Sequence, residues 1–192
     1  HAGAENATYL KDNKYDVNSI NYKNVESDLR AFSQATFGDD LLLNYMSYNV
    51  HFDRDKIKSK GLDLTTVKQS FKDYLYTKEY VKRVYTEEEI LAATGNDVLL
   101  DFVSKGYDPT QNGELYFVYK PGYLEYSTTG TTHGSPYTYD THVPIIFYGW
   151  HIKKGKTNDR KEITQIAPTV TQLLKITMPN STKGEVLTEI VD

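Results

Sequence analysis

The sequence contains no cysteine. This absence excludes disulfide bonds, zinc sites built from thiolates and a thiol nucleophile, so any metal must be held by histidines and carboxylates. No apolar run approaches the roughly 20 residues that a membrane-spanning helix needs, and we expect no membrane association. The chain is not basic either: 22 Lys and Arg against 26 Asp and Glu give a formal net charge of -4. Because phosphate-backbone contacts need clustered positive charge, we expect no nucleic-acid partner.

The first residues lack the features of a signal peptide. Residue 1 is a histidine, and "HAGAENATYL" has neither the charged start nor the apolar centre of such a segment. We therefore expect that the chain starts at a processed, engineered or truncated end. Its 192 residues, 39% of them hydrophobic, suffice for a globular domain with a substantial core.

Helical spacing of apolar residues and turn residues divide the first half of the chain. Thr86, followed by three glutamates, is a typical helix start. The expected elements are a helix over 24–38 ending at Gly38, a hairpin over 41–53, two helices over 54–80 separated at Gly61, a strand over 81–86, and two helices over 86–107 separated at Gly95. We expect residues 41–112 to form an α+β subdomain.

The second half is richer in β-type residues. "GELYFVYKPGYLEY" (113–126) predicts strands interrupted by Pro121 and Gly122. "VPIIFYGW" (143–150) is continuously apolar, which is typical of a strand buried on both faces in a mostly parallel sheet. "EITQIAPTVTQLLKI" (162–176) places its apolar residues on one helical face, and we expect this helix to pack against that sheet.

A loop rich in polar side chains separates these strands. His133 is followed directly by Gly134, which allows close approach of the backbone to a ligand or metal. Asp140 and His142 lie just before the apolar segment, where a bracing role for the loop is the simpler interpretation. From these residues alone, metal binding or catalysis by His133 and a purely structural role both stay open.

Two long stretches carry a resemblance to a known family: "GTTHGSPYTYDTHVPIIFYGWHIKKG" (130–155) and "ITQIAPTVTQLLKITMPN" (163–180). They resemble the alkaline phosphatase superfamily, in its bacterial phosphate-irrepressible phosphomonoesterase branch. "HAGAENATYL" at the start is similar to that family's Asp-His stretch with the Asp removed. The similarity also includes residues 43–75, and it therefore extends along the whole chain.

The resemblance implies an α/β fold: the C-terminal portion of a mostly parallel sheet flanked by helices, with an inserted α+β subdomain. It implies three parts, namely core residues 1–40, the insert 41–112, and a C-terminal core with the metal-ligand loop over 113–192.

The resemblance also implies a chemistry. Two Zn²⁺ ions about 4 Å apart hold the attacking and leaving oxygens of a phosphoryl displacement, and a Thr or Ser attacks phosphorus to give a phosphoenzyme. His133 would bind one zinc and His1 the other, with Asp140, His142 and Ser135 supporting them. Phosphate monoesters would be the substrates.

The same resemblance shows what the 192 residues lack. In the family the nucleophile, the remaining metal ligands and the phosphate clamp precede the Asp-His pair. We therefore expect a C-terminal fragment that is inactive alone and needs the missing N-terminal portion as its partner. By the same analogy, the intact enzyme is exported to the periplasm or secreted.

Other interpretations use the same residues differently. A phosphodiesterase or nucleotide pyrophosphatase of the same superfamily would share the metal ligands. The amino group and imidazole of His1, with His133, would also suit Cu²⁺ in a histidine-brace oxidase, but the expected helices do not match a β-sandwich. A non-enzymatic binding module would use the 17 tyrosines, although these are spread along the chain.

Overall fold

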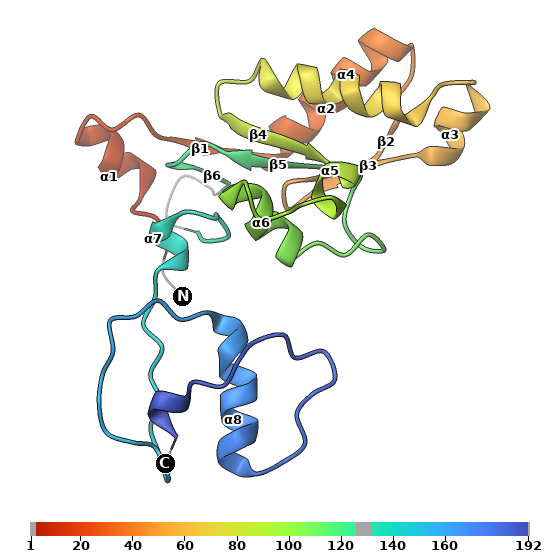
Figure 1. Cartoon of the computed structure of the whole chain (residues 1–192). Coiled ribbons are helices and arrows are strands. Elements are labelled where there is room, and N and C mark those ends of the chain that lie inside the picture. Colours follow the sequence, from red (N-terminus) through yellow and green to blue (C-terminus); the bar gives the residue numbers. More distant parts are fainter. Residues whose placement is uncertain (1–2, 126–131, 192) are drawn as a thin grey trace. The chain divides into compact units, whose positions relative to one another are not determined.

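In a computed structural model of the chain, residues 3–125 and 132–191 are described. Contacts between residues divide the chain into two compact units, a first unit, His1–His142, and a second unit, Val143–Asp192 (Figure 1). In chain order the helices and strands are α1 Ala7–Asp12, β1 Asn18–Ile20, α2 Tyr22–Phe37, β2 Leu42–Met46, β3 Asn49–Phe52, α3 Arg54–Ser59, α4 Leu64–Tyr76, β4 Val81–Thr86, α5 Glu87–Leu91, α6 Val98–Lys105, β5 Leu115–Tyr119, β6 Tyr123–Glu125, α7 Thr138–Thr141, η1 Ile163–Gln165, α8 Ile166–Leu174 and η2 Thr188–Ile190. In the part of the chain that is described, no helix is both long and apolar enough to cross a bilayer.

The main sheet of the first unit has four strands in the order β2-β3-β5-β4, and every pairing is antiparallel. The expectation of a mostly parallel sheet is therefore wrong for the described residues, where the parallel pairing is that of β1 with β6. The reason is the connection between strands. β2 and β3 are joined by a two-residue turn at Ser47 and Tyr48, and so short a connection permits only antiparallel pairing.

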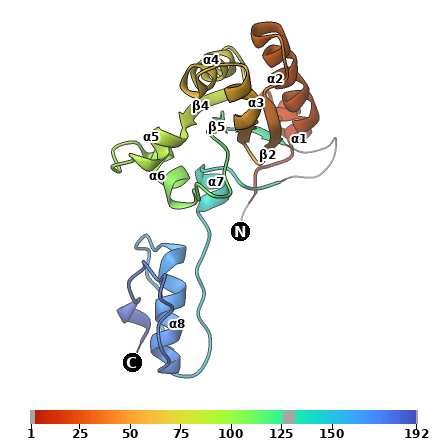
Figure 2. The ribbon, with the colours of Figure 1, turned by 90° about the vertical axis from the view of Figure 1, so that its right-hand side faces the viewer.

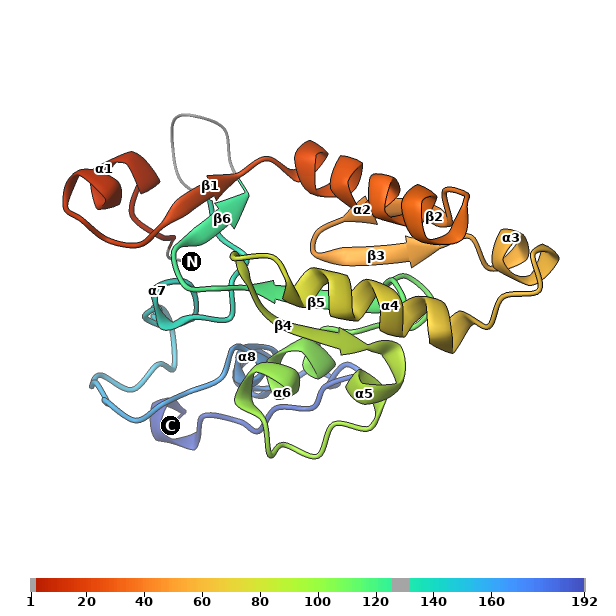
Figure 3. The same cartoon turned by 90° about the horizontal axis from the view of Figure 1, so that it is seen from above.

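Alternation along β5 places two hydrophobic clusters on opposite faces of this sheet. Leu115, Phe117 and Tyr119 belong to the larger cluster, whereas Tyr116 and Val118 contact the smaller one. Figure 3 shows α2 and α4 lying along one face, and Figure 1 shows α5 and α6 beneath the other. The mixed α/β architecture expected from the sequence is thus present, with the larger core under α2 and α4.

Local sequence signals set the helix boundaries as expected. Gly38 ends α2 with a φ of 70°, a left-handed conformation that glycine adopts without steric cost. Thr86 starts α5 through a capping box, in which its hydroxyl accepts from the Glu89 N–H and the Glu89 carboxylate accepts from the Thr86 N–H. The hairpin over 41–53, the helix break at Gly61 and the strand over 81–86 are confirmed as well.

The sheet crosses one of the predicted boundaries. β5 begins at Leu115, beyond the expected 41–112 subdomain, and pairs with both β3 and β4. The contact-based division falls between His142 and Val143. The three-part division of the chain remains a proposal.

In the second unit, the predicted buried strand over 143–150 is wrong for the described structure. No residue of this segment belongs to a strand, and Ile146, Tyr148 and Trp150 are 82%, 100% and 83% exposed. A strand exists only through hydrogen bonds to a neighbour, and the described residues offer this segment none. The apolar sequence is typical of a buried segment, but the described residues do not cover it.

The helix predicted over 162–176 does form, as η1 followed by α8 (Figure 2). The described residues of the second unit contain no sheet for it to pack against. Instead, the Thr169 hydroxyl of α8 accepts a hydrogen bond of 2.9 Å from the Leu187 N–H, and Leu187 is buried beside it. Gly184 comes so close to the helix start that a Cβ there would lie 2.1 Å from the Thr164 carbonyl oxygen.

Candidate functional site

The polar loop of the first unit ends in a single helical turn, α7. His133 lies before this turn with an exposed side chain. His142 is the residue at the end of the turn; its N–H donates to the Thr138 carbonyl at 3.0 Å and its side chain is exposed. The helical turn α7 therefore lies between the two histidines in the chain.

Asp140 holds the two ends of this loop together. Its side chain is only 8% exposed, and its Oδ2 accepts a hydrogen bond of 2.7 Å from the Ser135 backbone N–H. A carboxylate acceptor makes such a bond about twice as strong as a neutral one. Ser135 follows His133 by two positions, so the bond fixes the backbone next to that histidine.

The second carboxylate oxygen of Asp140 is the exception among buried polar atoms. Its Oδ1 is buried and has no hydrogen-bond partner among the described residues. A buried acceptor without a donor costs roughly 1 to 3 kcal/mol, and natural proteins keep few of them. The unpartnered Oδ1 therefore lowers the stability that this loop contributes to the fold.

Of the five site residues expected from the sequence, the structure brings Asp140 and Ser135 into contact. His1 lies outside the described residues, so its placement relative to His133 stays a prediction. Residues 126–131, which precede His133 in the expected loop, also lie outside them.

The described residues do not fit a complete metal site. Among them, no group of three or more histidine, aspartate or glutamate side chains is placed to hold one ion. Zinc sites in proteins use at least three such ligands. His133 on its own is at most one ligand.

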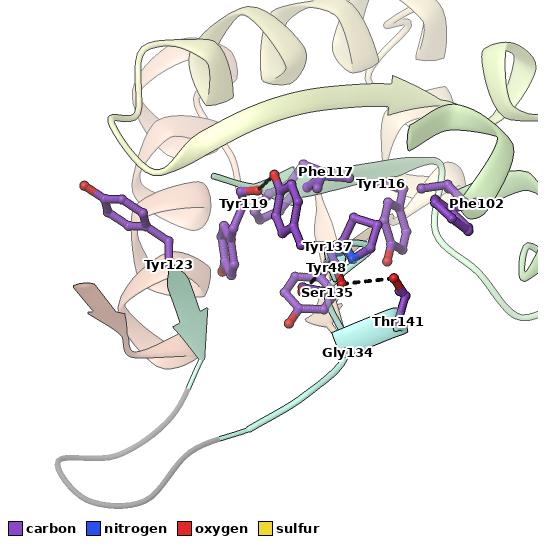
Figure 4. A pocket seen from close by; sticks show the side chains of 13 residues that line it. Tyr48, Phe102, Tyr116, Phe117, Tyr119, Tyr123, Gly134, Ser135, Tyr137 and Thr141 are labelled. Atoms are coloured by element: carbon purple, nitrogen blue, oxygen red, sulfur yellow. Dashed lines mark hydrogen bonds between the residues drawn. The ribbon is translucent and has the colours of Figure 1, made fainter. Parts of the chain in front are cut away.

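A pocket that sequence reasoning missed lies next to the loop. Its volume is about 250 Å³, and β5, α6, the β2–β3 turn and the loop after His133 form its walls (Figure 4). The lining residues include Tyr48, Phe102, Tyr116, Tyr137 and Thr141, together with Gly134 and Ser135. The tyrosines are dispersed in the sequence. The pairing of β3 with β5 brings Tyr48 near Tyr116, and a hydrogen bond to the Tyr119 carbonyl brings Tyr137 to β5, so no local sequence pattern predicts the pocket.

Burial keeps the phenols of this pocket protonated. It raises the pKa of Tyr116 and of Tyr137 to about 12, and it also raises the pKa of Tyr48. The Tyr137 hydroxyl donates to the Tyr119 carbonyl at 2.6 Å and so ties the loop to β5. The neutral form of these phenols therefore persists to a higher pH than that of an exposed tyrosine.

A buried polar cluster lies behind the pocket wall. The hydroxyls of Tyr45 and Tyr119 are 3.0 Å apart, and both donate to the same Oε1 of Glu125, Tyr119 at 2.5 Å. Burial is the main cause that raises the pKa of both phenols, and the Glu125 charge adds to it. These bonds link β2, β5 and β6 and hold the ring of Tyr119 in place.

The chain is similar in sequence to known alkaline phosphatases. No family model matches it. Alkaline phosphatase PafA of Elizabethkingia meningoseptica is 31% identical over 193 residues, which cover 100% of this chain and 35% of that protein. Alkaline phosphatase PhoV of Synechococcus elongatus is 32% identical over 167 residues, 87% of this chain and 30% of that protein. A Myroides odoratus protein named calcium-transporting ATPase is 29% identical over 195 residues, 100% of this chain and 36% of that protein.

Solved structures agree with the sequence comparison. The crystal structure of wild-type PafA matches with a TM-score of 0.91 and 31% identity, over 99% of this chain and 36% of that one. The chain is thus a homologue of bacterial alkaline phosphatases. In particular, it is homologous to PafA and PhoV and corresponds to a segment of about a third of their length.

Proposed function

We propose that these 192 residues form part of a metal-dependent phosphoric ester hydrolase that acts on small-molecule phosphate monoesters. The observation that carries this proposal is the match to PafA along the full chain, in sequence at 31% identity and in structure at a TM-score of 0.91. The chain contributes a segment of the enzyme, because it spans only about 35% of the length of PafA.

Within this segment His133 is the proposed ligand of one of two zinc ions, and His1 that of the other. The exposed position of His133, on a loop fixed by the Asp140–Ser135 bond, supports its role. Asp140, Ser135 and His142 are proposed to position it. Bound zinc would supply positive charge to phosphoryl oxygens. The remaining ligands and the nucleophile are proposed to come from polypeptide outside the 192 residues.

The exposed segment over 143–150 supports the proposal that further polypeptide, outside the 192 residues, completes the site. Its apolar side chains would be covered if further strands paired with it. The proposed parts are then core residues 1–40, the insert 41–112 and the C-terminal core 113–192. By analogy with the family, the enzyme would act in the periplasm or outside the cell.

Hydrolysis of phosphoanhydrides or diesters is a second candidate with the same ligands. The name of the Myroides odoratus relative, a calcium-transporting ATPase, favours testing an anhydride substrate beside the monoester. The reaction would differ in the leaving group and would leave the assignment of His133 unchanged.

A chimera tests the proposal. The 192 residues replace the homologous segment of PafA, and release of phosphate from a monoester is measured with zinc present. We expect zinc-dependent hydrolysis. His133→Ala should reduce kcat/KM at least about 100-fold and remove one of two bound zinc ions per molecule, because the loss of a ligand weakens the metal more than the loss of a supporting residue.

His51→Ala is the control, since it removes a different imidazole, one that is partly exposed and lies on β3. It should leave both activity and zinc content unchanged. A folded chimera that hydrolyses the monoester equally well with His133→Ala would contradict the assignment of this residue. A folded chimera without hydrolysis and without bound zinc would contradict the proposed function.

A further inference from the structure

The aromatic pocket of the first unit has no role in the function proposed so far. One of its lining residues is Gly134, the residue directly after His133. A Cβ on Gly134 would lie 3.9 Å from the Tyr48 hydroxyl, which places that phenol beside the loop. A molecule held near His133 would therefore have this pocket within reach.

Tyr48 occupies a backbone position that does not suit it. It lies in the β2–β3 turn with a φ of 69°, where glycine or asparagine is favoured and a bulky residue costs roughly 1 to 2 kcal/mol. Its ring is held edge-on against Tyr119 with centroids 5.2 Å apart, and it also contacts the ring of Tyr116. Strain of this kind tends to persist where the side chain has a function.

The composition of the pocket restricts what it accepts. Among the described residues no lysine or arginine lines it, so these residues supply no positively charged side chain to an anionic phosphoryl group. Its walls are aromatic rings, and its polar groups are neutral hydroxyls, as on Tyr48, Tyr116 and Thr141 (Figure 4). Ligand pockets usually have volumes of about 300 to 1,000 Å³. At about 250 Å³ this pocket lies below that range, which favours a single planar ring system over a larger group.

We propose that this pocket receives the uncharged aromatic ring of a phosphate ester whose phosphoryl group lies at the His133 loop. The ring would stack on the aromatic walls, as bases stack on aromatic side chains elsewhere. The substrate class is thereby narrowed to esters of aryl or nucleoside alcohols. The phosphoryl part of this inference rests on the proposed function, whereas ring binding does not.

Binding to the 192-residue chain is measured by NMR, following the backbone amides of Gly134 and Tyr137 in the pocket and of Gly38 far along α2. Three probes are compared: phenyl phosphate, adenosine 5′-monophosphate and glycerol 1-phosphate, which has no ring. We expect saturable shifts at the pocket amides with at least one ring-bearing probe and none with glycerol 1-phosphate. Which ring binds more tightly separates an aryl from a nucleoside ester.

Tyr48→Asn is the discriminating variant. Asparagine tolerates a positive φ, so the chain should stay folded while ring binding weakens about tenfold. Tyr15→Asn makes the same substitution at a tyrosine that is 62% exposed and should bind like the wild type. If Tyr48→Asn does not fold, Thr141→Trp serves instead, because it fills the pocket from an exposed position.

No saturable binding of either ring-bearing probe would overturn the inference, as would equal shifts with glycerol 1-phosphate or unchanged binding in both pocket variants. These outcomes are separate from those of the chimera. Ring binding without hydrolysis would leave the pocket assigned and the phosphatase proposal refuted, and hydrolysis without ring binding would do the reverse.

Discussion

Replacing Asp140 tests whether its carboxylate holds the loop next to His133. The bond from the Ser135 N–H to Oδ2 is 2.7 Å long, and hydrogen bonds to charged groups contribute about 1.5 to 3 kcal/mol. Asp140→Ala removes the bond and leaves the Ser135 N–H without this acceptor. We expect it to lower the free energy of unfolding by about 2 kcal/mol, which corresponds to about 4 to 8 °C in Tm for a chain of this length.

Asp140→Asn separates the hydrogen bond from the charge. The amide oxygen still accepts from Ser135, while an uncharged amide NH2 group takes the place of the unpartnered Oδ1. We therefore expect a change of less than about 1 kcal/mol.

Urea unfolding followed by the near-ultraviolet circular dichroism of the tyrosines measures both variants. An equal loss in Asp140→Ala and Asp140→Asn, or no loss in either, would refute the bracing role.

Three further predictions follow from single positions. Gly113→Ala should destabilise the chain by about 1 to 3 kcal/mol in urea unfolding, since its Cβ would lie 2.3 Å from the Val50 carbonyl oxygen, whereas Gly155→Ala, with open space around it, should have no effect. The hydrogen bond from the Thr66 backbone N–H lowers the pKa of Asp63 below its ordinary 3.8. The stability from this cap is therefore present above pH 3.8 and is lost as the pH falls through the folded pKa. Asp63→Asn should reduce this loss of unfolding free energy at acid pH. Burial raises the pKa of Tyr116 from 10.0 to about 12, so the stability that this tyrosine contributes below pH 10.0 is lost as the pH rises toward 12. Tyr116→Phe should reduce this loss of stability and also the phenolate absorbance that appears over the same pH range.

Elements fixed by neighbouring residues were predictable from the sequence. The Gly38 stop of α2, the Thr86 capping box and the break at Gly61 each depend on residues within one turn of the element they define. Such signals do not depend on the rest of the fold. The helices α2 to α6 and the β2–β3 hairpin are therefore predicted within a few residues of their observed bounds.

Features that depend on distant partners were not predictable. The apolar sequence over 143–150 indicates burial but not what buries it, and the described residues supply no neighbouring strand. The antiparallel pairing of β5 with β3 and β4 was also missed, because it follows from which strands meet and not from the composition of any one of them.

The candidate site also combines features that were predictable from neighbouring residues with features that were not. The Gly after His133 and the acidic residue before the apolar segment single out the loop that adjoins the pocket, and Asp140 does contact Ser135. The pocket was missed because Tyr48, Tyr116 and Tyr137 come from a turn, a strand and a loop far apart in the sequence. The pairing of β3 with β5 brings Tyr48 near Tyr116, and a hydrogen bond to the Tyr119 carbonyl brings Tyr137 to β5; composition reveals neither contact.

Phosphate release from p-nitrophenyl phosphate by the purified 192-residue chain in zinc buffer tests most directly whether this segment needs further polypeptide to complete its site. With no group of three or more metal-binding side chains among the described residues, the rate should equal that of buffer without protein. Zinc-dependent turnover by the chain alone, abolished by His133→Ala, would contradict the account.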